Sequence, residues 1–205
     1  MKKAIVFDFG GVLIDWSPYH LYRKLLPTDD AVREFLEEIK FSEFNKKLDA
    51  GYSFTKMKEE LLKKYPRQQE LVRAFFERWM ECTGEAIQPT VDIMREVKSA
   101  GYPVYGLSNW STETFPLLQH RYPFLPELDG YLLSGMAGVA KPDEEIFKIF
   151  LARVERSAED CVFIDDAQMN IDTARRLGFN SILFTSAQQL RAEMAAMGVL
   201  NGKLN

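Results

Sequence analysis

Cysteine is scarce in this chain, and no long apolar run is present. Two cysteines, Cys82 and Cys161, occur among 205 residues and form no C-x-x-C pair. This excludes a disulfide framework and leads us to expect reduced, buried thiols in a cytoplasmic protein. No stretch approaches the roughly 18 apolar residues that a membrane span requires. We therefore expect no membrane insertion.

An excess of positive charge is missing as well. The net charge is −4 and the pI is about 5.4, whereas nucleic-acid binding usually needs a basic surface. The acidic balance still allows phosphorylated small molecules, because a bound metal and one or two cations reverse the field locally. Hydrophobic residues make up 46% of the chain, enough for a substantial core. The sequence does not define an oligomeric state.

Short apolar runs that end at polar residues predict buried strands. They cover residues 4–7, 103–107, 161–164 and 181–184, with a weaker run at 130–133. Amphipathic helical patterns lie between them, over residues 91–98, 143–154, 170–177 and 185–197. Alternating strands and helices predict an α/β fold with a parallel sheet and helices on both faces.

Residues 17–88 show a different pattern. Leucine and phenylalanine recur there at helical spacing among lysines and glutamates, and no run typical of a buried strand appears. We therefore expect a core domain from residues 1–16 and 89–205, and an inserted helical cap domain from residues 17–88.

Polar side chains follow several predicted strands. The carboxyl ends of parallel strands share one edge of the sheet, where ligands bind in open α/β folds. A carboxylate, a hydroxyl, a lysine and a carboxylate pair are therefore expected to converge. The residues concerned are Asp8, Ser108, Asn109, Lys141, Asp165 and Asp166.

Each of these signals has an ordinary structural alternative. Asp8 alone is typical of a turn, and Ser108 with Asn109 is typical of a helix cap. Lys141 before a proline commonly marks the start of a helix. The adjacent pair Asp165 and Asp166 is harder to explain in this way, because two carboxylates repel and a cation relieves the repulsion. The order and placement of all these residues favour a site.

These residues carry a family resemblance. The segments Asp8-Phe9-Gly10-Gly11-Val12, Leu107-Ser108-Asn109, Lys141-Pro142 and Phe163-Ile164-Asp165-Asp166 resemble the four motifs of the haloacid dehalogenase superfamily. Residues 101–110 and 140–147 resemble its sugar-phosphatase branch, which includes glucose-1-phosphate phosphatases. The predicted insert stands where this superfamily carries a C1-type cap. The resemblance implies a Rossmannoid core with an α-helical cap.

The resemblance also implies a magnesium-dependent phosphatase that acts on a small phosphorylated metabolite, such as a sugar phosphate. Asp8 would form an aspartyl-phosphate, and Mg²⁺ would reduce the repulsion between the two anions. The implied metal ligands are Asp8, the Gly10 carbonyl and Asp166, with Asp165 as a further ligand or support. The implied contacts to the phosphoryl group come from Ser108, Asn109 and Lys141.

One position departs from the superfamily pattern. Many phosphatases of this superfamily have a second aspartate two residues after the nucleophile, as general acid and base, and Gly10 stands there instead. General acid–base help is typically worth about 10²–10⁴-fold in rate. Our hypothesis is that poor leaving groups react slowly, or that another group substitutes.

Three further residues have candidate roles. Trp16 and His20 lie where the chain enters the cap, and are candidates for substrate contact. Aromatic packing for Trp16 and a structural role for His20 are the common alternatives. Asn170, which follows Asp166 by one helical turn, is a candidate for positioning Lys141 or the carboxylates, with helix capping as the alternative.

Two rival functions use the same fold. A haloacid dehalogenase attacks carbon with the same aspartate, without metal, and also lacks the second acid. The pair Asp165 and Asp166 argues against this, because it suits a cation. A non-catalytic binding module is the second rival, and the presence of all four motifs argues against it.

Overall fold

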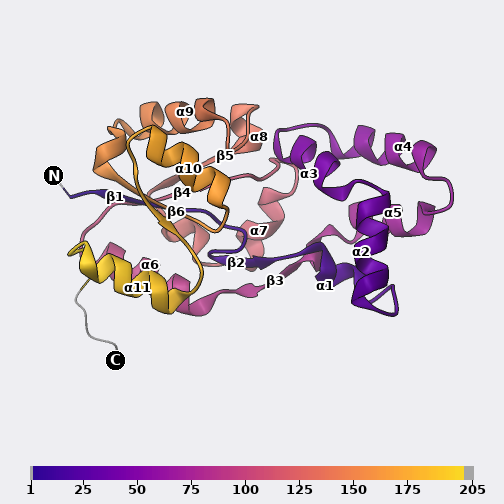
Figure 1. Cartoon of the computed structure of the whole chain (residues 1–205), viewed down its shortest axis with the longest axis horizontal. Helices are drawn as coiled ribbons and strands as arrows, with labels where there is room; N and C mark the ends of the chain where they lie inside the picture. Colours follow the sequence, from indigo (N-terminus) through magenta and orange to yellow (C-terminus); the bar gives the residue numbers. More distant parts are fainter. Residues whose placement is uncertain (1, 201–205) are drawn as a thin grey trace.

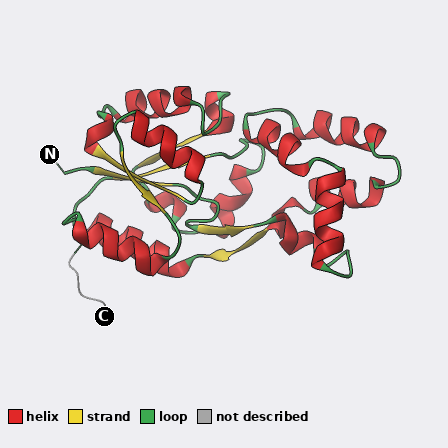
Figure 2. Cartoon of the chain, in the orientation of Figure 1, coloured by secondary structure: helices red, strands yellow, loops and turns green. Residues whose placement is uncertain are grey.

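The computed structural model describes residues 2–200, which are built around a five-stranded parallel sheet (Figures 1 and 2). The strand order is β5-β4-β1-β6-β7, so β1 is central and Asp8 follows it at the middle of the carboxyl edge. Sequence prediction placed each end of these strands within one residue. The strands are β1 (Ala4–Phe7), β4 (Val104–Ser108), β5 (Gly130–Leu133), β6 (Cys161–Asp165) and β7 (Asn180–Leu183).

The central strand is buried on both faces, which explains its continuous apolar sequence. All four residues of β1 are fully buried. Ile5 and Phe7 belong to one hydrophobic cluster, and Ala4 and Val6 belong to another. This alternation follows from the two-residue period of a strand. The predicted α/β fold class is confirmed.

Helices cover both faces of the sheet. In Figure 1, α9 and α10 lie above it, and α6 and α11 lie below it. Asp143 caps α9, since its side chain accepts a hydrogen bond from the backbone N–H of Glu145. The core helices are α6 (Gln88–Ser99), α7 (Phe115–Arg121), α8 (Ser134–Ala137), α9 (Glu144–Val154), α10 (Gln168–Arg176) and α11 (Ala187–Ala196), with 3₁₀ turns at Leu125–Glu127 and Ala158–Asp160.

The segment between β1 and α6 is largely helical and lies at the right of Figure 1. Side chains of Ser17, Thr28 and Ser53 accept hydrogen bonds from the first turns of three of these helices. The division into two domains at residues 16/17 and 88/89 stays a proposal. Residues 1 and 201–205, which the prediction assigned to the core domain, lie outside the part of the chain that the structure describes. The helices are α1 (Pro18–Tyr22), α2 (Asp29–Glu38), α3 (Phe41–Asp49), α4 (Phe54–Lys64), α5 (Gln69–Glu77) and the 3₁₀ turn Trp79–Cys82.

A small antiparallel sheet was missed in the sequence. β2 (Ile14–Trp16) pairs with β3 (Thr83–Ala86) and joins the start of the helical segment to its end. β3 reads Thr-Gly-Glu-Ala and is only partly buried, so it has no apolar run to mark it. The paired strand β2 ends at Trp16, which places this residue at the entrance to the helical segment.

Within residues 2–200, no helix combines the length and the apolar character that crossing a bilayer demands. The expected cytoplasmic location and the expected lack of nucleic-acid binding stay predictions.

Candidate active site

Asp8 lies at the end of the central strand and is almost completely buried. Its backbone N–H donates to the carbonyl of Ile164 at 2.9 Å. Its Oδ1 accepts a hydrogen bond from the backbone N–H of Phe9 at 2.7 Å, and its Oδ2 lies 2.9 Å from Lys141 Nζ. Both carboxylate oxygens are thus held in place before any ligand binds.

Lys141 is the buried cation beside this carboxylate. Its Nζ donates to Asp165 Oδ2 at 2.6 Å and to the Leu107 carbonyl at 2.8 Å. The side chain of Asn109 fixes the Lys141 backbone through two reciprocal hydrogen bonds of 2.9 and 2.8 Å. Burial lowers the pKa of Lys141, but the carboxylates of Asp165 and Asp8 outweigh burial and hold it above its ordinary value. Lys141 therefore stays charged.

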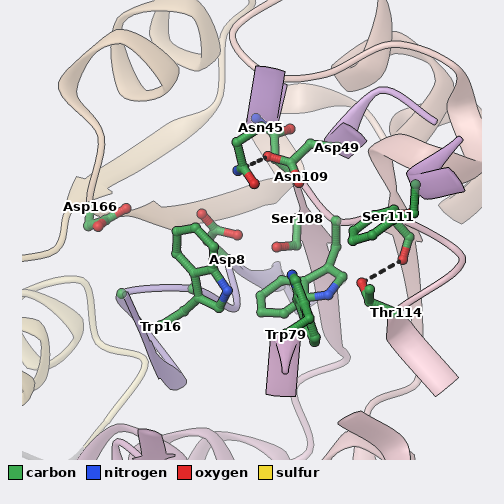
Figure 3. A pocket seen from close by; sticks show the side chains of 14 residues that line it. Asp8, Trp16, Asn45, Asp49, Trp79, Ser108, Asn109, Ser111, Thr114 and Asp166 are labelled. Carbon is green, nitrogen blue, oxygen red and sulfur yellow. Dashed lines mark hydrogen bonds between the residues drawn. The ribbon is translucent and has the colours of Figure 1, made fainter. Parts of the chain in front are cut away.

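The two adjacent aspartates have different surroundings. Asp165 is fully buried, and its oxygens accept from Lys141, from the Asn170 amide at 2.9 and 3.0 Å, and from the Ala167 N–H at 2.8 Å. Asp166 is exposed and lines a cavity, as Figure 3 shows. Asp165 thus orients Lys141, and Asp166 is free to bind a ligand. Asn170 makes a positioning contact of the kind suggested by the sequence.

Gly11 has a conformation and a packing that a side chain would disrupt. Its φ of +74° favours glycine. A Cβ at this position would lie 2.2 Å from Oδ2 of Asp166. The loop can therefore hold the Asp166 carboxylate close only because residue 11 is glycine.

The site holds more negative than positive charge. Oxygens of Asp8, Asp165 and Asp166 lie within 4.8 Å of one another, and Lys141 supplies one positive charge among them. Burial raises the pKa of Asp8, Lys141 lowers it, the charge of Asp165 raises it and Ser108 lowers it, and together these effects bring it to about 7. Asp166 is exposed to the cavity but partly desolvated there, and this desolvation together with the charge of Asp165 raises its pKa against the lowering effect of Lys141. An oxygen-lined cluster with this imbalance fits a hard divalent cation such as Mg²⁺.

A cavity of about 350 Å³ opens above Asp8 (Figure 3). Its volume fits a small molecule. Two tryptophans, Trp79 and Trp110, meet edge to face in its wall at a ring-centre distance of 5.7 Å. The lining residues are Asp8, Gly10, Gly11, Trp16, Asn45, Asp49, Phe54, Trp79, Ser108, Asn109, Trp110, Ser111, Thr114 and Asp166.

Ser108 contributes a buried hydroxyl to this cavity. Its Oγ makes no well-aligned hydrogen bond with a described residue, although its closeness to the Asp8 carboxylate lowers the pKa of Asp8. The indole nitrogens of Trp16 and Trp110 have no hydrogen-bond partner among the described residues. Buried polar atoms without a partner are uncommon and costly. A hydroxyl without a well-aligned partner beside Asp8 fits a bound anion such as a phosphoryl group.

The structure brings most of the predicted site residues together. Asp8, Gly10, Trp16, Ser108, Asn109 and Asp166 line the cavity, and Lys141 and Asp165 lie beside Asp8 without lining it. His20 is not among the lining residues, and its Nε2 lies 2.9 Å from Asp15 Oδ1. The short helix α1 carries His20 away from the cavity, so we leave it out of the proposed site.

The sequence analysis missed the contribution of α3, which belongs to the helical segment between β1 and α6. Asn45 and Asp49 reach the cavity from its last turn, and Phe54 reaches it from the start of α4. The Asn45 amide donates to Asp49 Oδ2 at 3.0 Å. Their four-residue spacing was visible, but such pairs are common on exposed helices. Only the tertiary structure shows that this pair lines the same cavity as Asp8.

The model of the family described as haloacid dehalogenase-like hydrolase matches residues 2–178 of this chain. The chain belongs to the haloacid dehalogenase-like hydrolases. The superfamily predicted from the four motifs is therefore confirmed, and so is the prediction of a hydrolase.

Several relatives of this haloacid dehalogenase-like hydrolase cover almost its whole length. A sesquiterpene phosphatase of Aspergillus oryzae is 24% identical over 90% of this chain and 91% of its own. A D-ribitol-5-phosphate phosphatase of Bacteroides thetaiotaomicron is 24% identical over 96% of this chain and 98% of its own. A variant of a haloacid dehalogenase family enzyme from B. thetaiotaomicron, crystallised with magnesium and inorganic phosphate, has the same fold. Its TM-score is 0.71 at 19% identity, over 91% of this chain and 95% of that one.

Proposed function

We propose that this hydrolase is a magnesium-dependent phosphatase that acts on a small phosphorylated metabolite, of about the size of a sugar or polyol phosphate. One observation carries the proposal. A buried carboxylate, Asp8, shares a small cavity with a buried hydroxyl, Ser108, and with an exposed carboxylate, Asp166. The relatives named as phosphatases support the same reaction class.

The proposed metal ligands are Asp8, Asp166 and the backbone carbonyl of Gly10. When bound there, Mg²⁺ supplies positive charge that lets the phosphoryl group approach the carboxylate. Asp165 has its hydrogen-bonding capacity taken up by Lys141, Asn170 and Ala167, so we assign it to positioning Lys141 rather than to the metal. A nearby cation would also counter the effect of burial on the Asp8 pKa and favour its ionised form.

The protein groups then divide the work of phosphoryl transfer. Asp8 attacks phosphorus and becomes an aspartyl-phosphate, which water hydrolyses in the second half-reaction. Ser108 donates its hydroxyl hydrogen to a phosphoryl oxygen. Lys141 stabilises charge on Asp8 and on the transferring group. The Asn109 side chain makes two hydrogen bonds to the backbone of Lys141, which hold Lys141 in place beside Asp8.

The walls of the cavity support a small organic substrate. Trp16, Trp79, Trp110 and Phe54 provide aromatic surface, and Asn45 provides a side-chain amide. Aromatic faces combined with a few polar groups suit the apolar faces and hydroxyl groups of a sugar or polyol. The volume of about 350 Å³ is in the range of small-molecule sites.

Phosphate release from sugar phosphates, polyol phosphates and p-nitrophenyl phosphate tests the proposal. We expect turnover with Mg²⁺, loss of turnover in EDTA, recovery on adding Mg²⁺ back, and no turnover by Asp8→Asn. Equal turnover in EDTA would contradict the metal assignment. Halide release from 2-haloacids in EDTA, without phosphate release, would favour a dehalogenase. No phosphate release, together with no beryllofluoride adduct on Asp8, would favour a non-catalytic module.

A further inference from the structure

The nucleophile has no acid two residues after it, so the proton for the leaving group needs another source. The carboxyl groups that line the cavity, among the described residues, belong to Asp8, Asp166 and Asp49. Asp8 is the proposed nucleophile, and Asp166 is a proposed metal ligand. Asp49 has no role in the site described so far.

Asp49 is held over the cavity by contacts from both the cap and the core. It is the last residue of α3, and its backbone carbonyl accepts a hydrogen bond from the hydroxyl of Ser134 in the core. The same hydroxyl accepts from the Trp110 N–H at 2.8 Å. The Asn45 amide donates to Oδ2 of Asp49, which leaves Oδ1 as the oxygen to carry a proton. Figure 3 shows Asn45 and Asp49 facing the cavity that contains Asp8.

The surroundings of Asp49 favour its protonated form. Burial and the charge of Asp8 raise its pKa, Lys141 opposes both effects, and the net result is a pKa of about 8. Its place at the carboxyl end of α3 acts in the same direction, because the helix dipole disfavours a negative charge there. A general acid needs this state at the start of the reaction, and a pKa near the working pH lets it return the proton afterwards.

We propose that Asp49, delivered by the cap, is the general acid and base of this phosphatase in place of the missing second aspartate. This inference rests on the proposed function. As the bond from Asp8 to phosphorus forms, the bond from phosphorus to the leaving oxygen breaks, and the Asp49 carboxyl gives its proton to that oxygen. In the second half-reaction the Asp49 carboxylate takes a proton from water as the water oxygen attacks phosphorus. Asp8 leaves as a carboxylate, and Asp49 is protonated again.

The variant Asp49→Asn tests this with two aromatic substrates that differ in leaving group. Benzyl phosphate leaves as a strongly basic alkoxide and needs the acid, so its turnover should fall about 10²–10⁴-fold. p-Nitrophenyl phosphate leaves as a weakly basic phenolate, so its first half-reaction should continue. We expect a burst of p-nitrophenolate followed by slow turnover, because the aspartyl-phosphate lacks its base. Asp92→Asn is the matched control, since Gln88 donates to Asp92 across the same four-residue spacing on the exposed face of α6.

A second variant relocates the acid. A Cβ at Gly10 would lie 3.7 Å or more from its nearest neighbours, in Trp110 and Trp16, so the first atom of a substituted side chain makes only ordinary contacts there. Asp49→Asn/Gly10→Asp should turn over benzyl phosphate at least about tenfold faster than Asp49→Asn does. This gain is a small part of what general acid–base help supplies. Equal slowing of both substrates without a burst, no slowing at all, or no recovery in the double variant would overturn the inference. An inactive wild-type protein would instead overturn the proposed function.

Discussion

Replacing Lys141 by methionine removes the positive charge on which two buried carboxylates depend. Methionine keeps much of the side-chain volume, so the change tests charge more than packing. The side chain of Lys141 is fully buried and has contacts of 2.6, 2.8 and 2.9 Å to Asp165, Leu107 and Asp8. Breaking a buried ion pair by removing one partner costs about 3–5 kcal/mol.

For a chain of this length, 1 kcal/mol shifts Tm by about 2–4 °C. Lys141→Met should therefore lower Tm by about 6–20 °C. The assay is thermal unfolding followed by circular dichroism in EDTA, so that no metal compensates for the missing charge. Lys148→Met is the control, because its ion pair with Glu144 is exposed and single, and such pairs are worth at most about 1 kcal/mol.

A double variant separates the charge from the cavity it leaves. In Lys141→Met/Asp165→Asn the second buried charge is also gone, and replacing both partners of a buried pair is often close to neutral. Its Tm should lie above that of Lys141→Met. A Tm for Lys141→Met within the range of the Lys148→Met control, or a double variant less stable than the single one, would refute the electrostatic reasoning.

Two further predictions concern the cavity. Ser108→Ala removes a buried hydroxyl that makes no well-aligned hydrogen bond with a described residue, so Tm should stay within about 2 °C. Its kcat should fall about 10²–10³-fold through loss of a donor to the phosphoryl group, and a change in Tm without a change in kcat would contradict this. For Asp49, a folded-state pKa raised to about 8 means that the stability it contributes is complete at low pH and is lost as pH rises toward 8. Asp49→Asn has no such loss, so its Tm relative to wild type should rise from pH 5 to pH 8 in EDTA, and a constant difference would argue against the raised pKa.

Local sequence was sufficient to predict the sheet and the core of the site. Strands buried on both faces leave continuous apolar runs, and polar residues directly after them lie at one edge of a parallel sheet. Asp8, Ser108 and Asp166 were therefore identifiable from their own neighbourhoods, whereas Lys141 was identified from its place in the loop before a predicted helix and from the order of the motifs. β2 and β3 were not, because short and partly exposed strands carry no such run.

Other features depend on contacts between residues far apart in the chain. Asp165 and Asp166 are chemically identical neighbours, and only the hydrogen bonds from Lys141 and Asn170 distinguish the buried one from the free one. Asp49 is 41 residues from Asp8 in the sequence and meets the same cavity only because Ser134, 85 residues further along, holds the end of α3 against the core. Sequence specified which chemical groups the protein has. The tertiary structure decided which of them lose water and face one another, and burial and proximity are what set a pKa.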